Sequence, residues 1–149
     1  MAIMQIRHAL TTDAPAVTPL LVQLGYPDND VDDVRRRLER WERHPEGAAF
    51  VAESDGTVVG VIAVVAIPLF EREGSVGRIV ALVVNESQRG TGVGRELVAV
   101  AEAEALRWGC IAMEVSSSRH RTGAHAFYRA RGYEDRCERS AKFYRALTA

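Results

Sequence analysis

Apolar positions recur along the first half of the chain at the spacing of helices. A helix is predicted over residues 13–24, with Thr12 or Asp13 as its cap, and Gly25-Tyr26-Pro27 ends it. A second helix, closing near residues 44–45, is indicated by four apolar residues on one face: Val31, Val34, Leu38 and Trp41. Its charged residues, among them three consecutive arginines at 35–37, are expected to form a solvated, salt-bridged face.

β-branched and alternating runs predict the strands. They cover residues 2–7, 48–53, 57–67, 75–84, 110–116 and 140–147. Asp55-Gly56 supplies the positive φ angles of a tight turn, so the second and third runs form a hairpin. A further short helix is predicted over residues 122–130. This order of elements predicts a mixed α/β fold, with one sheet and helices on its faces.

A glycine-rich loop lies between the apolar run at residues 79–84 and a third helical pattern. The helix is marked by Val93, Leu97, Val100, Ala101, Ala105 and Trp108. Its first N–H groups lack intrahelical acceptors, and the helix dipole leaves partial positive charge there, so the loop is suited to bind an anion. Glycines permit the positive φ angles that point successive N–H groups toward such a ligand.

Three ligands compete for this loop. A dinucleotide fingerprint, G-x-G-x-x-G, would need glycine where Arg95 stands, and a nucleotide P-loop would end in Gly-Lys followed by Ser or Thr, which is missing. Residues 89–94 (RGTGVG) instead match Q/R-x-x-G-x-G/A, the pyrophosphate loop of acyl-CoA-binding N-acetyltransferases. A strand-to-helix turn without a ligand is the remaining alternative.

Composition limits the other classes of protein. The chain has 149 residues, enough for one domain, 1–149, that buries roughly 70% of its unfolded surface. A net charge of −1 gives no general attraction to nucleic acid or to anionic membranes, and we expect neither as a partner. Without a secretory signal pattern, a cytoplasmic location is expected. Cys110 and Cys137 have no neighbours at metal-ligand spacing, so no metal is expected, and Cys110 is predicted to be buried.

A second motif supports the CoA interpretation. Residues 124–133 (AHAFYRARGY) match A-x-x-F-Y-x-x-x-G-F/Y, a signature near the C-terminus of the GNAT superfamily of acetyl-CoA-dependent N-acetyltransferases. Two motifs in the right order make the whole chain resemble a small, single-domain bacterial member. The resemblance implies an α+β fold: a mostly antiparallel central sheet of about six to seven strands, about four flanking helices, and a splay between the fourth and fifth strands.

The resemblance also implies the co-substrate and where it binds. Acetyl-CoA would place its pyrophosphate on the loop and its pantetheine arm along the preceding strand, whose main-chain donors would stabilise the oxyanion. The residues implied are Leu82, Val83, Val84, Arg89, Gly90, Thr91, Gly92, Val93, Gly94 and Arg95.

Two catalytic roles follow from the resemblance. Tyr128 is expected to be the general acid that protonates the departing thiolate when an amine attacks directly. Glu114 interrupts an apolar strand and is the candidate general base, in line with a similar Glu-Val in ribosomal-protein N-terminal acetyltransferases. A solvated position on the sheet, with water as the base, is the alternative for Glu114.

The resemblance implies that the acceptor is an amine of a small molecule or a peptide: an aminoglycoside, a polyamine, a peptide N-terminus or a lysine. The residues expected near it are Tyr26, Asp28, Glu71, Glu73 and His120, although the acids at 28–30 could instead cap the second helix. Many relatives have an asparagine in the loop at residues 116–121, where this chain offers only Ser118 or Arg121 as a substitute. The resemblance is compatible with a homodimer.

Two other functions remain open at this point. One is an acyl-CoA-binding regulatory module without turnover, against which Tyr128 argues. The other is a nucleotide-binding or redox domain, against which the missing motif residues argue.

Overall fold

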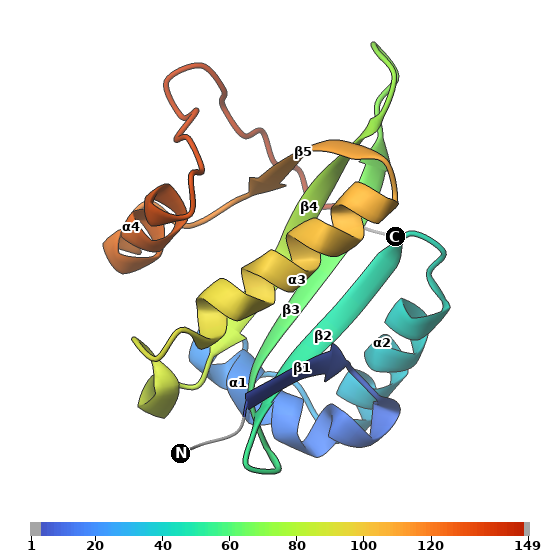
Figure 1. Cartoon of the computed structure of the whole chain (residues 1–149), viewed down its shortest axis with the longest axis vertical. Helices are drawn as coiled ribbons and strands as arrows, with labels where there is room; N and C mark the ends of the chain where they lie inside the picture. The colour runs from blue at the N-terminus through green and yellow to red at the C-terminus, as the bar shows by residue number, and fades with distance from the viewer. Residues whose placement is uncertain (1–3, 148–149) are drawn as a thin grey trace. The chain divides into compact units, whose positions relative to one another are not determined.

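A computed structural model describes residues 4–147 (Figure 1). Its elements, in chain order, are β1 (Met4–His8), η1 (Thr11–Asp13), α1 (Ala14–Leu24), α2 (Val31–Arg43), β2 (Gly47–Ser54), β3 (Thr57–Pro68), β4 (Ser75–Val84), η2 (Glu86–Gln88), α3 (Val93–Arg107), β5 (Cys110–Val115) and α4 (Thr122–Ala130). The chain divides into two compact units, Met1–Ser116 and Ser117–Ala149. We call them unit 1 and unit 2 and describe each by itself; a single domain over 1–149 stays a prediction.

Unit 1 is built on a five-stranded sheet in the order β1-β2-β3-β4-β5. The first three pairs are antiparallel and the β4–β5 pair is parallel. Asp55 and Gly56 join β2 to β3 with φ angles of 49° and 81°, which confirms the predicted hairpin turn. The mixed, mostly antiparallel sheet expected from the sequence is therefore present.

Helices cover both faces of this sheet (Figure 1). On one face, α1 and α2 pack on β2 and β3 and form a buried core. The helices contribute Leu20 and Leu38, and the strands contribute odd-numbered positions such as Val51 and Val61. On the other face, α3 packs so closely on β3 that a Cβ built at Gly60 would lie 3.0 Å from Leu97 Cδ1. This close approach brings the N-terminus of α3 against the sheet.

An ion pair ties β1 to the start of α1. Both terminal nitrogens of Arg7 lie 2.8 Å from the two carboxylate oxygens of Asp13, which also accepts a 2.7 Å hydrogen bond from the Leu10 N–H. Asp13 stands at the N-cap position of α1, but its side chain makes no capping bond there, and none is made by Thr12. The predicted position of the cap at Asp13 is confirmed, but the expected capping bond is not formed, because the carboxylate is engaged by the guanidinium and by the preceding turn.

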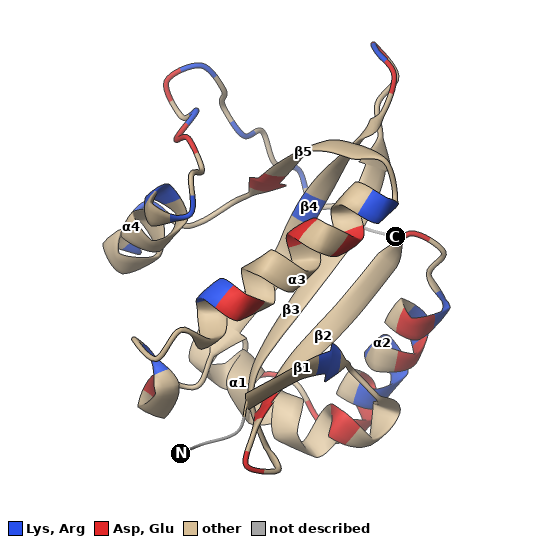
Figure 2. Cartoon of the chain, viewed as in Figure 1, with Lys and Arg blue, Asp and Glu red and all other residues tan. Residues whose placement is uncertain are grey.

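The ends and surface of α1 and α2 follow the sequence prediction. Gly25, at φ 114°, ends α1 in the left-handed conformation. On α2, Arg35 pairs with Asp32, and Arg36 with Asp33, so the arginine run lies in the charged face seen in Figure 2. These side chains are 45–75% exposed, and ion pairs this exposed to solvent contribute little to stability.

Unit 2 contains one described helix, α4, whose bounds match the prediction. Gly132 follows it at φ 89°, and its N–H bonds to Arg129, while the Tyr133 N–H bonds to Tyr128. The predicted strand at residues 140–147 is wrong: these residues are exposed and form no strand in the described chain. An extended sequence pattern becomes a strand only with a partner, and the sheet has five strands rather than six to seven.

Two further observations concern classes of protein considered above. No helix between residues 4 and 147 is long and apolar enough to span a bilayer. The same residues contain no cluster of three or more side chains suited to hold a metal ion. Cys110 is buried, as predicted, and burial raises the pKa of its thiol.

Candidate active site

The glycine loop has the conformation that an anion cradle requires. Gly90 and Gly92 have φ angles of 80° and 92°, and a Cβ built at either position would meet no atom within 4 Å. Glycine is thus required here by the left-handed backbone, and the space around it is open. The first main-chain bond of α3 runs from the Glu96 N–H to the Gly92 carbonyl, at 3.1 Å. The N–H groups of residues 93–95 precede that bond and are the ones a helix leaves without intrahelical acceptors.

Polar contacts fix the turn between β4 and this loop. The Asn85 N–H donates to the Val59 carbonyl of β3 at 2.7 Å, and its side chain accepts from the Ser87 N–H at 3.0 Å. From α1, Gln23 Oε1 accepts the Glu86 N–H at 3.0 Å. The hydroxyl of Thr91 then donates to the Gln88 carbonyl. The loop is therefore anchored to β3 and α1.

β4 is paired on both edges for only half of its length. Its residues 75–79 pair with β5, and the last pair is Ile79 with Val115. Its residues 80–84 continue along β3, but within residues 4–116 no strand pairs with their other edge. A bulge marks the transition, since Ala63 pairs with Ala81 and Val64 with Ile79, which leaves Val80 unmatched. This is the geometry of the predicted splay between the fourth and fifth strands.

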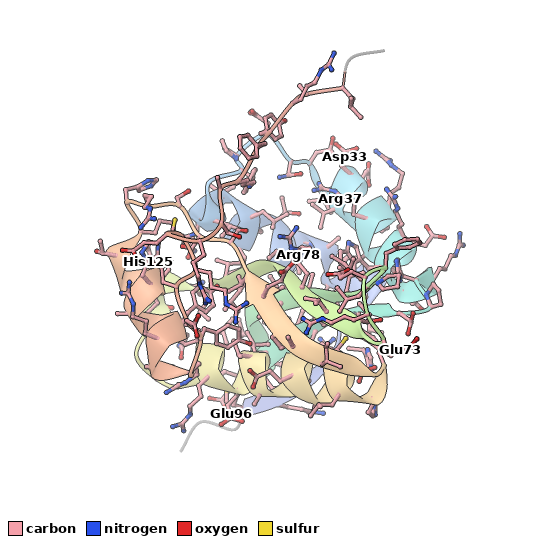
Figure 3. The ribbon with its side chains drawn as sticks, turned by 90° about the horizontal axis from the view of Figure 1, so that it is seen from above. Asp33, Arg37, Glu73, Arg78, Glu96 and His125 are labelled. Atoms are coloured by element: carbon pink, nitrogen blue, oxygen red, sulfur yellow. The ribbon has the colours of Figure 1, made fainter. Side chains whose placement is uncertain are left out.

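Glu114 lies directly before this opening. Its carboxylate is 3.1 Å from Arg78 Nε, its register neighbour on β4, and the two side chains are 49% and 44% exposed. Gly77 faces α3, because a Cβ there would meet Ala105, so the next residue, Arg78, faces the side of α1 and α2. Figure 3 shows Arg78 on that side of the sheet. Glu114 is thus a surface carboxylate in an ion pair, not one buried at sheet depth.

The acceptor candidates of unit 1 fall into two separate places. Tyr26 is exposed and Asp28 follows it in the connection between α1 and α2. Asp30 caps α2 by accepting the Asp33 N–H at 2.9 Å, which lowers the pKa of the Asp30 carboxyl. Glu71 and Glu73 lie in the turn before β4, about 30 Å along the strand from the glycine loop. The structure does not bring these two glutamates together with the loop.

Unit 2 holds Tyr128 in an aromatic cluster. Its ring centroid lies 5.4 Å from that of Phe127 and 5.9 Å from that of Tyr133. Burial raises the pKa of its hydroxyl, and the charge of Arg121 opposes this shift. Tyr128 therefore stays protonated at neutral pH and can donate a proton. His120 is exposed, whereas the neighbouring His125 ring lies 2.8 Å from the Ser118 carbonyl.

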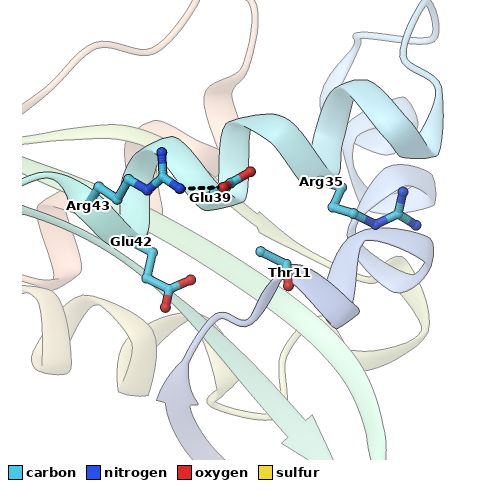
Figure 4. Close-up of a pocket in the computed structure, with 5 residues that line it drawn as sticks. All are labelled: Thr11, Arg35, Glu39, Glu42 and Arg43. Carbon is cyan, nitrogen blue, oxygen red and sulfur yellow. Dashed lines mark hydrogen bonds and ion pairs between the residues drawn. The ribbon is translucent and has the colours of Figure 1, made fainter.

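A separate hollow of about 370 Å³ lies beside α2 (Figure 4). It is lined by Thr11, Arg35, Glu39, Glu42 and Arg43, and Glu39 is engaged by Arg43 at 2.6 Å. None of these residues belongs to the glycine loop or to β4, so the hollow is distinct from the candidate site.

Comparison with known proteins decides the family. Residues 6–133 match the acetyltransferase (GNAT) family. The chain belongs to this family. An aminoalkylphosphonate N-acetyltransferase of Salmonella typhimurium is 31% identical over 134 residues, which are 90% of this chain and 87% of that enzyme.

Solved structures of GNAT enzymes share the fold. The aminoglycoside N-acetyltransferase AAC(6')-Iy, solved in complex with CoA, has a TM-score of 0.87 at 23% identity, covering 99% of this chain and 97% of that one. Glucosamine-6-phosphate N-acetyltransferase from Arabidopsis thaliana has a TM-score of 0.83 at 21% identity, covering 98% and 99%. The expected enzyme class, an acetyl-CoA-dependent N-acetyltransferase, is confirmed at the level of the family.

Sequence reasoning missed three residues around the candidate site: Gln23, Arg78 and Asn85. Asn85 carried a readable signal, because an asparagine directly after a strand often caps the next turn. Gln23 and Arg78 act across elements distant in sequence, so no local pattern marks them.

Proposed function

We propose that this chain transfers an acetyl group from acetyl-CoA to a primary amine. The observation that carries the proposal is the combination, within unit 1, of a half-unpaired strand and an open helix N-terminus directly after it. Membership of the GNAT family and the CoA bound by a solved relative support it. The acetyl thioester of the co-substrate supplies the electrophilic carbonyl.

The residues present fit this co-substrate. N–H groups at the start of α3, in the loop that holds Gly90 and Gly92, would bind the pyrophosphate, with Arg89 and Arg95 adding positive charge. Residues 80–84 would bind the pantetheine arm along their unpaired edge as an added strand. This edge is roughly 15 Å long and begins where Glu114 and Arg78 lie.

Each chemical role falls to a group of this chain. Glu114, or a water beside it, accepts a proton from the acceptor's ammonium group, and the free amine nitrogen bonds to the acetyl carbon. Main-chain N–H groups of β4 donate to the carbonyl oxygen as negative charge develops on it. The C–S bond breaks as the Tyr128 hydroxyl donates its proton to the sulfur. The attacking nitrogen loses its extra proton to water, and the Tyr128 oxygen takes a proton back from water, which leaves an amide, a free thiol and a neutral tyrosine.

The relatives support small amines as acceptors. The 31% identical relative is named for aminoalkylphosphonates as acceptors. A structural neighbour, AAC(6')-Iy, was solved with a bisubstrate analogue that joins CoA to monomethyl-acetylneamine. We infer the same broad class here. In unit 1, the connection that carries Tyr26 and Asp28 is the candidate acceptor surface.

A thiol-release assay tests the proposal. Acetyl-CoA is incubated with the protein and a panel of aminoalkylphosphonates, aminoglycosides, polyamines and peptides, and free CoA is measured with a thiol reagent. Amine-dependent release, with the acetylated amine detected by mass spectrometry, is the expected result. Tight CoA binding without release for every amine would instead favour a non-catalytic acyl-CoA-binding module.

A further inference from the structure

Arg78 differs from the other paired arginines of unit 1. Arg35, Arg36, Arg43 and Arg107 bridge to carboxylates three or four residues away on their own helices. Arg7 bridges between elements, but both of its terminal nitrogens donate to Asp13. Arg78 also bridges between elements, yet it contacts Glu114 through Nε.

Between residues 4 and 147, the two terminal nitrogens of Arg78 make no hydrogen bond. The guanidinium approaches Glu114 Oε1 at 3.1 Å through Nε, and the side chain is 44% exposed, so the terminal nitrogens are accessible to a ligand. The two Nη groups form the outer edge of a planar fork, which matches the oxygens of a phosphonate, phosphate or carboxylate. An anion can bind there without displacing Glu114.

The position of this pair connects it to the proposed reaction. Arg78 and Glu114 face the α1 and α2 side of the sheet, one register step before the last β4–β5 pair. The unpaired edge proposed for the pantetheine arm starts two residues further along β4. A positive and a negative side chain thus lie together where the arm would end.

We propose that the acceptor is a short zwitterion, an amine with an anionic group, and that Arg78 is a specificity-determining residue. Its Nη groups bind the acceptor's anion while the Glu114 carboxylate receives the ammonium group. The proposal rests on the proposed function and leaves its covalent step unchanged, since Arg78 exchanges no proton and forms no bond. The proposal is consistent with the 31% identical relative, an aminoalkylphosphonate N-acetyltransferase.

Acceptors matched in length provide the test. Three acceptors share a two-carbon amine and differ in the group at the other end. This group is a phosphonate in 2-aminoethylphosphonate, a carboxylate in β-alanine and a neutral hydroxyl in ethanolamine. With wild-type protein we expect kcat/KM to be at least tenfold higher for one of the two anionic amines than for ethanolamine. The ratio between phosphonate and carboxylate then identifies the preferred anion.

Variants assign this preference to the guanidinium. Arg78→Gln should lower the ratio of anionic to neutral kcat/KM about 10- to 100-fold, mainly through KM for the anionic amine. Arg78→Lys, which keeps the charge but loses the fork, should give an intermediate ratio. The matched control is Arg107→Gln, an exposed arginine of α3 paired with Glu104, which should keep the wild-type ratio.

A wild-type measurement keeps the proposal testable if Arg78→Gln does not fold. Methylphosphonate or acetate, whichever carries the preferred anion, should inhibit ethanolamine acetylation competitively against the amine. Equal kcat/KM for anionic and neutral amines, no inhibition by either anion, or an unchanged ratio in a folded Arg78→Gln variant would each overturn the inference. The proposed function would survive these results, because it fails only when no amine supports thiol release.

Discussion

Asp13→Asn is expected to destabilise unit 1, because it weakens the bidentate ion pair between Arg7 and Asp13. The substitution keeps the shape of the side chain but removes the charge that faces Arg7. In the native structure Asp13 is 7% exposed and accepts two bonds from Arg7 and one from the Leu10 N–H. The amide oxygen of asparagine can keep the bond from Leu10, so the variant isolates the contact with the guanidinium.

The size of the effect follows from exposure. Breaking a fully buried ion pair costs about 3–5 kcal/mol, because one charge stays buried and unpaired. The Arg7 side chain is 25% exposed and keeps Glu53 at 3.4 Å, so its remaining charge is partly compensated. We therefore expect a loss of about 2–3 kcal/mol in the free energy of unfolding. For a chain of this size that corresponds to a fall in Tm of about 5–10 °C.

The pH dependence gives a second signature. The hydrogen bonds from Arg7, with the further one from Leu10, lower the pKa of Asp13 below its ordinary value of 3.8, while burial opposes them. A carboxyl with a depressed folded-state pKa contributes stability above its unfolded pKa and loses it as the pH falls through the folded value. The pKa of Arg7 is raised further above the working range, so Arg7 stays charged throughout. The stability difference between wild type and Asp13→Asn should be constant between about pH 5 and 8 and shrink below about pH 4.

Urea unfolding followed by circular dichroism at several pH values measures both effects. Asp32→Asn is the matched control, because it neutralises a 75% exposed aspartate that also pairs with an arginine and should cost less than about 1 kcal/mol. If Asp13→Asn is no more destabilising than Asp32→Asn at pH 7, the ion pair does not hold β1 to α1. A difference that persists undiminished at pH 3 would refute the charge argument.

Three further predictions concern the proposed site. Tyr128→Phe should lower kcat about 10²-fold and change KM for acetyl-CoA little, which steady-state kinetics checks; unchanged turnover would remove its role as acid. Gly92→Ala should raise KM for acetyl-CoA several-fold, because a φ angle of 92° disfavours any residue with a side chain. The control is Gly25→Ala, at φ 114° but away from the loop, which should lower Tm and leave KM for acetyl-CoA unchanged. Glu114→Gln should move the acidic limb of the pH profile of kcat/KM if Glu114 is the base; an unmoved limb would assign the proton to water.

The features predicted well from the sequence are those with local causes. The turn at Asp55-Gly56 and the end of α1 at Gly25 depend on backbone angles that few residues adopt, so composition reveals them directly. The glycine loop is readable for the same reason, and α4 lies between a polar loop and a glycine. These segments would favour the same local conformations in most folds.

The errors concern contacts with residues outside the local pattern. Residues 140–147 contain the aromatic and apolar residues of a possible strand, but pairing depends on a partner that their own sequence does not contain. Asp13 has the right type and position for a helix cap, yet a guanidinium six residues earlier takes its carboxylate. Arg78 and Glu114 meet only through the register of a parallel pair, which local patterns do not encode.

The unpaired half of β4 also bears on the behaviour of the protein in concentrated solution. Within residues 4–116, the outer edge of residues 80–84 pairs with no strand, and an edge of this kind is a surface onto which the strand of another molecule can add. The bulge at Val80 bends this edge, and the turn at η2 ends it after five residues, which limits how much foreign strand could dock. A ligand that covers the edge should therefore also keep the protein monodisperse, and storage with CoA is expected to suppress association through this edge.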